Sequence, residues 1–170
     1  VKDLRYELQE DCELNICTFE NSEEGKKAYW HTTAHIMAQA VKRLFPNVKF
    51  AIGPSINNGF YYDFDIEKPF TDEDKANIEA EMKKIIKEDI DIERFSLPKQ
   101  EALELMKGQP YKQELINDLP EGEEISFYKQ GDFTDLCAGP HLMKTGKVKA
   151  VKILSSSGAY WRGDEHNKML

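Results

Sequence analysis

Four side chains able to bind a metal or transfer protons occur in two short pairs. His31 and His35 are four residues apart, and Cys137 and His141 have the same separation. Residues four apart on a helix project from one side, so the two histidines could act on a single water, metal or substrate. These pairs contain three of the four histidines in the chain. We therefore expect one site that uses both pairs.

Two kinds of chemistry suit this set of side chains. Imidazole and thiolate are natural zinc ligands, and His31, His35, Cys137 and His141 would fill a tetrahedral site. The same groups could instead hold or deprotonate a water without a metal, because histidine titrates near neutral pH. Each pair alone is weak support, since a histidine beside a helix core is commonly a structural hydrogen-bonding residue. Asp135 would face the same side of a strand as Cys137.

A long helix is expected to carry the two histidines. Ser22 is a suitable cap at its start, and Pro46 ends it. Ala38, the next residue along the histidine row, is small and should leave open space there. At 100° per residue, an apolar stripe for packing on a core is formed by Trp30, Ala34, Met37, Val41, Leu44 and Phe45.

The other segments combine helices with strands in no regular alternation. Asn57-Asn58-Gly59 predicts a hairpin, and Thr71 begins a helix that runs to about Asp89. Strand patterns and short helices complete a predicted α+β fold, with a mixed, largely antiparallel sheet and one long site-bearing helix. The expected strands cover 2–7, 14–19, 49–56, 59–66, 90–97, 124–130, 132–137 and 148–161, and the short helices cover 98–106 and 111–119.

Composition limits the classes of protein to consider. With 170 residues, 40% of them hydrophobic, the chain can bury one sizeable core. A net charge of −8 argues against a domain that binds nucleic acid by itself, so other parts of a protein would have to deliver the nucleic acid, or a local basic groove would have to bind it. The absence of a membrane-span pattern, of a leader and of CxxC spacing predicts a reducing, cytoplasmic location. A start at Val1 and the final EHNKML suggest a piece of a longer protein.

Five ordered segments are distinctive: HTTAHIMAQAVKRLFP, GPSINNGFYYDF, PYKQELI, GDFTDLCAGPHL and SSSGAYWRGDEHNKML. In this order they closely resemble the stretches of bacterial threonyl-tRNA synthetases that lie between the small N-terminal domain and the aminoacylation core. The resemblance implies an editing domain at 21–170 that runs into the linker to the absent core, with a fold shared with alanyl-tRNA synthetase. It also implies that 1–20 are the C-terminal end of a small β domain of the TGS type. Alanyl enzymes share only the HxxxH and CxxxH pairs.

The resemblance also implies an activity: hydrolysis, by attack of water, of serine mischarged on tRNA-Thr. Serine lacks one methyl group of threonine, and such a difference gives only about 1–3 kcal/mol of discrimination, so a second site must remove the error. The implied partners are tRNA-Thr carrying Ser and the rest of the same polypeptide. The parent ligase is expected to be a homodimer, and no membrane is expected as a partner. A zinc-dependent deacylase of the alanyl type and a noncatalytic tRNA-docking module are the alternatives.

The resemblance assigns particular residues to this hydrolysis. His31 or Lys112 would help to activate water, Tyr62 would contact the substrate, and no covalent intermediate on Cys137 is required. Without the resemblance, Lys112 would be interpreted as a surface lysine and Tyr62 equally well as strand packing. No cofactor is expected for editing, although zinc on the four His and Cys side chains is the alternative; the parent enzyme would use ATP, Mg and Zn in its absent core. The implied catalytic residues are His31, His35, Lys112, Asp135, Cys137 and His141.

Overall fold

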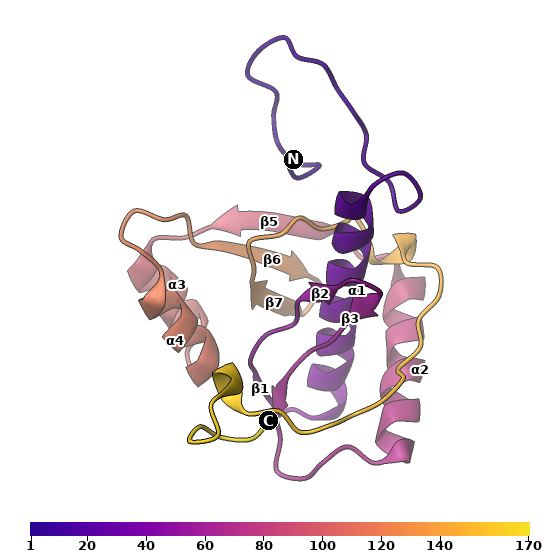
Figure 1. The fold of residues 1–170 in the computed structure, drawn as a ribbon, viewed down its shortest axis with the longest axis vertical. Helices are drawn as coiled ribbons and strands as arrows, with labels where there is room; N and C mark the ends of the chain where they lie inside the picture. Colours follow the sequence, from indigo (N-terminus) through magenta and orange to yellow (C-terminus); the bar gives the residue numbers. More distant parts are fainter.

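The fold combines four α-helices with short antiparallel strands, in a computed structural model that describes residues 1–170 (Figure 1). This confirms the predicted α+β class with antiparallel pairing. Two strand pairs, β1–β4 and β2–β3, accompany a three-stranded sheet of order β5–β6–β7. The elements are α1 (Glu23–Leu44), β1 (Lys49–Phe50), β2 (Ser55–Ile56), β3 (Gly59–Phe60), β4 (Phe64–Asp65), α2 (Asp72–Glu88), β5 (Ile92–Ser96), α3 (Lys99–Leu105), α4 (Pro110–Asp118), β6 (Ser126–Gln130) and β7 (Phe133–Leu136), with 3₁₀ turns η1 (Thr145–Lys147) and η2 (Trp161–Gly163).

Helix α1 is the central element of the molecule. In Figure 1 it stands between α2 on one side and the sheet with α3 and α4 on the other. Ser22 caps its start by accepting a hydrogen bond from the Gly25 N–H at 3.0 Å, as predicted. Gly25 must lack a side chain, because a Cβ there would lie 2.1 Å from the carbonyl oxygen of Thr18. The helix thus begins and ends close to the predicted residues.

The predicted apolar stripe of α1 was too narrow. Leu44 is 39% exposed, whereas Ile36 and Ala40, outside that stripe, are fully buried. Ala38 is also fully buried in the main core, so the open space expected beside it is not found. The stripe assumed a helix covered on one face, but elements on several sides of α1 enclose its middle.

The hairpin and the second long helix agree with the sequence. Ile56 pairs with Gly59, so Asn57 and Asn58 form the two-residue turn and Gly59 already belongs to the return strand. Helix α2 begins after Thr71, which forms a capping box with Asp74. Its buried side is formed by Ile78, Met82 and Ile85.

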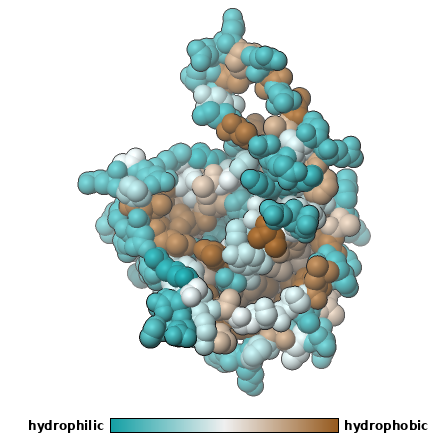
Figure 2. All heavy atoms as spheres, viewed as in Figure 1, coloured by the Kyte–Doolittle hydropathy of each residue, from teal (hydrophilic) through white to brown (hydrophobic).

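A second, smaller core lies between the three-stranded sheet and helices α3 and α4. On the face drawn in Figure 2, apolar side chains gather in this part of the molecule. Its buried members are Ala102, Met106, Ile116, Ile125 and Phe127. This core anchors α4 against the sheet and so places both of them around the candidate site.

Two groups of predicted strands are absent. Residues 2–7 and 14–19 form no strand, and the N-terminal segment stands as a loop at one end of the molecule (Figure 1). Residues 148–161 also form no strand, apart from an isolated bridge between Tyr160 and Met169. Alternating side chains produce a strand only where a neighbouring strand supplies hydrogen bonds, and in these segments only residues 159–161 have such bonds, with residues 168–170. The assignment of 1–20 to a preceding β domain stays a prediction.

None of the helices combines the length and the apolar character needed to cross a membrane.

Loss of the Met82 side chain should destabilise the fold, because it is fully buried where α2 meets the main core. Met82→Ala should lower the free energy of unfolding by about 2–5 kcal/mol, measured by urea denaturation. Met143→Ala is the matched control, since Met143 is 43% exposed and should change stability by less than about 0.5 kcal/mol. Equal losses in both variants would contradict this packing.

Candidate functional site

The two pairs of residues meet in one buried cluster. Helix α1 supplies His31 and His35, and the segment after β7 supplies Cys137 and His141. One potential ligand atom from each side chain lies within 4.8 Å of all the others. The Cys137 Sγ is 3.3 Å from the His31 Nε2 and 3.2 Å from the His141 Nε2. The structure therefore brings together residues that are more than a hundred positions apart.

A sharp turn returns the chain to the cluster. Gly139 has a φ of 78°, and a Cβ at this position would lie 2.1 Å from the Tyr128 hydroxyl oxygen. Both the backbone angle and the close contact require glycine. The Gly139 N–H also donates to the Cys137 Sγ at 3.3 Å. The Gly139-Pro140 turn that the sequence indicated thus places His141 beside Cys137.

Asp135 joins a second group of side chains to the cluster. Its Oδ1 lies 2.7 Å from the Lys112 Nζ, and its Oδ2 accepts a hydrogen bond from the Tyr62 hydroxyl at 2.5 Å. The His35 Nε2 is 3.5 Å from the same Oδ2. Lys112, from α4, is only 3% exposed, so it is an internal lysine and not a surface one. Every residue assigned to the site from sequence therefore lies in one connected group.

Burial sets the protonation of the cluster. Removal from water lowers the pKa of His31 to about 4, although the Asp135 carboxylate opposes the shift. Burial likewise holds the pKa values of His35 and His141 well below the usual range. Positive charge on neighbouring groups lowers these two pKa values further. Burial raises the pKa of the Cys137 thiol to about 12. At neutral pH the site thus contains neutral imidazoles and an uncharged thiol.

The cluster has the donor set of a metal centre. Three imidazoles and one sulfur suit tetrahedral zinc, whose ligand atoms are roughly 3.5 Å apart when bound at about 2.0–2.3 Å. The Cys137–His31 and Cys137–His141 separations are close to that value. The His35 Nδ1 is buried and has no hydrogen-bond partner, so it offers a free lone pair or N–H. His31, His35, Cys137 and His141 could therefore hold a metal ion, with loss of the thiol proton.

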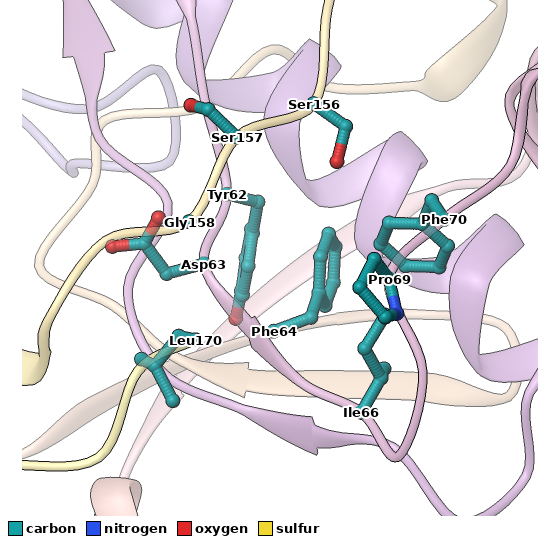
Figure 3. Close-up of a pocket in the computed structure, with 10 residues that line it drawn as sticks. All are labelled: Tyr62, Asp63, Phe64, Ile66, Pro69, Phe70, Ser156, Ser157, Gly158 and Leu170. Carbon is teal, nitrogen blue, oxygen red and sulfur yellow. The ribbon is translucent and has the colours of Figure 1, made fainter.

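Tyr62 also lines a neighbouring cavity. This cavity has a volume of about 270 Å³. Figure 3 shows the Tyr62 and Phe64 rings that line it, together with Ser156 and Ser157 from the C-terminal segment, which forms no strand. The Tyr62 ring stacks on Phe64 with centroids 4.8 Å apart, while its hydroxyl reaches Asp135. Tyr62 is therefore shared between the cavity and the cluster.

Two residues that contact the His141 segment, Thr32 and Arg5, were not anticipated from sequence. Thr32 is fully buried, and its Oγ1 lies 3.1 Å from the His141 Nδ1. The sequence offered one indication of this role: Thr32 directly follows His31 inside the HTTAH segment. Arg5 donates hydrogen bonds to the carbonyl oxygens of His141 and Leu142 at 3.3 and 2.7 Å. Nothing in the local sequence around Arg5 indicates this contact, because it joins residues far apart in the chain.

Removing either charge of the buried Lys112–Asp135 pair should destabilise the protein, since the other charge would remain buried without a partner. Lys112→Met or Asp135→Asn alone should each cost about 3–5 kcal/mol of unfolding free energy in urea denaturation. The double variant should cost less than the sum of the two.

The exposed pair Lys107–Glu104 provides the control for this prediction. Lys107→Met should cost less than about 1 kcal/mol, because water already solvates both of its charges. Additive losses in the Lys112 and Asp135 variants would contradict a direct coupling.

Comparison with known proteins agrees with this architecture. The family described as "Threonyl and Alanyl tRNA synthetase second additional domain" matches residues 125–170. The whole chain is 67% identical to the threonine–tRNA ligase of Acetivibrio thermocellus, of which it covers 27%. It is 66% identical, again over its whole length, to the ligases of Caldanaerobacter subterraneus subsp. tengcongensis and Clostridium perfringens, covering 27% and 26% of them.

The chain thus spans about a quarter of the length of these relatives. The matched region covers the whole chain and so includes both segments that form the His and Cys cluster. The chain therefore matches, along its whole length, the N-terminal part of bacterial threonyl-tRNA synthetases that contains the second additional domain.

Proposed function

We propose that this chain is an editing domain that hydrolyses the ester between serine and tRNA for threonine. The observation that carries the proposal is the buried cluster, in which neutral imidazoles adjoin the Lys112–Asp135 pair. A threonine enzyme needs such an activity, because one missing methyl group gives only about 1–3 kcal/mol of discrimination. Similarity to threonine–tRNA ligases supports this choice of amino acid and tRNA.

His31 is suited to activate the water. It is the least buried of the three clustered histidines, and its neutral ring has a lone pair that can accept a proton. The water oxygen attacks the ester carbonyl while one of its protons passes to His31. The ester C–O bond then breaks, His31 returns its proton to the leaving ribose oxygen, and free serine and uncharged tRNA leave.

Lys112 is suited to stabilise the negative charge that develops on the carbonyl oxygen. Its ammonium group has three N–H donors, and Asp135 holds it in place through a 2.7 Å contact. A fixed positive charge in a buried site is worth far more than the same charge in water. The terminal ribose hydroxyl of the tRNA completes the donor set around this oxygen.

Cys137 does not act as the nucleophile in this proposal. Burial raises its thiol pKa to about 12, so the reactive thiolate is scarce at neutral pH. Hydrolysis of an aminoacyl ester does not require a covalent intermediate. The Cys137 side chain instead packs between His31 and His141 and accepts the Gly139 N–H.

The same cluster supports a second candidate, a zinc-dependent deacylase, because its donor set suits zinc. Zinc held by His31, His35, Cys137 and His141 would supply Lewis-acid activation of a water. We propose that no metal is needed, since His31 can take the proton and Lys112 provides the positive charge. Both candidates use the same residues, but only the zinc-dependent deacylase would lose its activity when metal is removed.

The proposal extends to the longer protein. Residues 21–170 form the editing unit and 1–20 end a small β domain, joined to an aminoacylation core that uses ATP, Mg and Zn in a cytoplasmic homodimer. Because the chain carries a net charge of −8, tRNA binding depends mainly on the other domains. Deacylation by the isolated chain should therefore be weak.

Deacylation of serine- and threonine-charged tRNA tests the activity. A protein that carries this chain with the remaining domains should release serine from tRNA for threonine much faster than it releases threonine. Lys112→Ala and His31→Ala should lower the rate of serine release about 10²–10⁴-fold, because each removes a group that acts on the reacting atoms. The measurement is loss of radiolabelled serine from the tRNA.

Lys107→Ala is the matched control, since Lys107 is exposed and pairs with Glu104 on the surface. It should leave the rate unchanged. Unaltered rates in Lys112→Ala and His31→Ala would reject the hydrolase and favour a noncatalytic tRNA-docking module.

Metal removal separates the two hydrolytic candidates. Protein treated with a chelator and shown to be metal-free by mass spectrometry should retain its rate of serine release. Loss of activity that zinc restores, while magnesium does not, would establish the zinc-dependent deacylase instead.

A further inference from the structure

Thr32 connects helix α1 to the segment that carries His141. Its Oγ1 lies 2.8 Å from the Ala28 carbonyl oxygen, 3.1 Å from the His141 Nδ1 and 3.0 Å from the Leu142 backbone nitrogen. The side chain is fully buried, so water does not compete for these bonds. One hydroxyl group thus contacts three partners on two segments.

The number of protons limits how these bonds can be arranged. A hydroxyl has one hydrogen to donate and two lone pairs to accept with. The Leu142 N–H must be a donor, so it uses one lone pair. The shortest contact, to the Ala28 carbonyl, can only receive the hydroxyl hydrogen. In the remaining contact the His141 Nδ1–H must therefore donate to the second lone pair of the Thr32 Oγ1.

We propose that Thr32 fixes His141 as the tautomer with its hydrogen on Nδ1. The Nε2 then presents a lone pair to the Cys137 Sγ, 3.2 Å away. A neutral imidazole carries only one N–H, so satisfying Nδ1 determines the state of the other nitrogen. Thr32 is a positioning residue: it acts through His141 and does not contact the cluster sulfur.

This assignment is consistent with the hydrogen bonds around Cys137. The buried Cys137 thiol already accepts the Gly139 N–H, and its own hydrogen needs an acceptor. The Nε2 lone pair of His141 supplies such an acceptor at 3.2 Å, and the His31 Nε2, 3.3 Å from the same sulfur, can then donate to the second sulfur lone pair. The bond from Leu142 to Thr32 additionally holds the turn so that the ring cannot rotate away.

The imidazole ¹⁵N chemical shifts of the full chain test the tautomer directly. Metal-free protein labelled with ¹⁵N-histidine should give a pyrrole-type shift for the His141 Nδ1 and a pyridine-type shift for its Nε2. Four histidines keep the spectrum simple, and comparison with His141→Gln assigns the signals. This reading depends on no enzymatic activity.

Three variants separate the role of the hydroxyl from that of the buried shape. Thr32→Val keeps the shape but removes the hydroxyl, and should lose the single-tautomer pattern. Thr32→Ser keeps the hydroxyl and should retain it. Thr33→Val is the matched control: Thr33 is equally buried and bonds the Tyr29 carbonyl at 2.8 Å, but has no contact with His141. It should give the wild-type pattern.

A kinetic measurement rests on the proposed function and is interpreted separately. Thr32→Val should lower kcat for serine release about 10–100-fold, a range typical of residues that orient another ligand or catalytic group, and should change KM by less than about twofold. Thr32→Ser should restore kcat. Absence of serine release in the wild type would reject the proposed function but leave the tautomer assignment standing.

Two outcomes would overturn the proposal. One is a pyrrole-type shift at the His141 Nε2 in the wild type, which decides the matter even if Thr32→Val does not fold. The other is an equal loss of the pattern in Thr33→Val, which would trace the effect to helix packing and not to the Thr32 hydroxyl.

Discussion

The buried pair of Lys112 and Asp135 is the constraint on which the rest of the site depends. Moving two charges out of water is costly, and their attraction offsets that cost only if the geometry is good and the remaining lone pairs are satisfied. The 2.7 Å ion contact and the Tyr62 hydrogen bond meet both conditions. Helix α4, strand β7 and the segment before β4 must therefore meet at one point. The second core beneath α4 maintains this arrangement.

Enclosure of helix α1 provides the other half of the chemistry. Its middle is covered by elements on several sides, so His35 is as deeply buried as the core residues around it. In that environment the charged form of an imidazole is disfavoured, and the ring keeps a lone pair at neutral pH. Proton transfer and metal binding both require such a lone pair. The same burial thus makes the cluster suitable for hydrolysis with or without a metal.

Local signals predicted the elements well where neighbours in sequence determine the structure. The Ser22 and Thr71 caps, the turn at Asn57 and Asn58, and the three strands of the largest sheet all follow from residues close together in the chain. Prediction was wrong where a partner was needed. Residues 148–161 alternate like a strand but, apart from the bridge between Tyr160 and Met169, find no segment to pair with and form no strand.

The sequence by itself determined the types and spacing of the site residues: two histidines one helical turn apart, and a cysteine with a histidine after a glycine turn. Those features depend on helix period and backbone angle, which are local. Only the tertiary structure decided that Lys112 is internal and that Thr32 bonds the His141 ring. Such contacts join positions about a hundred residues apart or lie on different elements, and packing of the whole chain sets them.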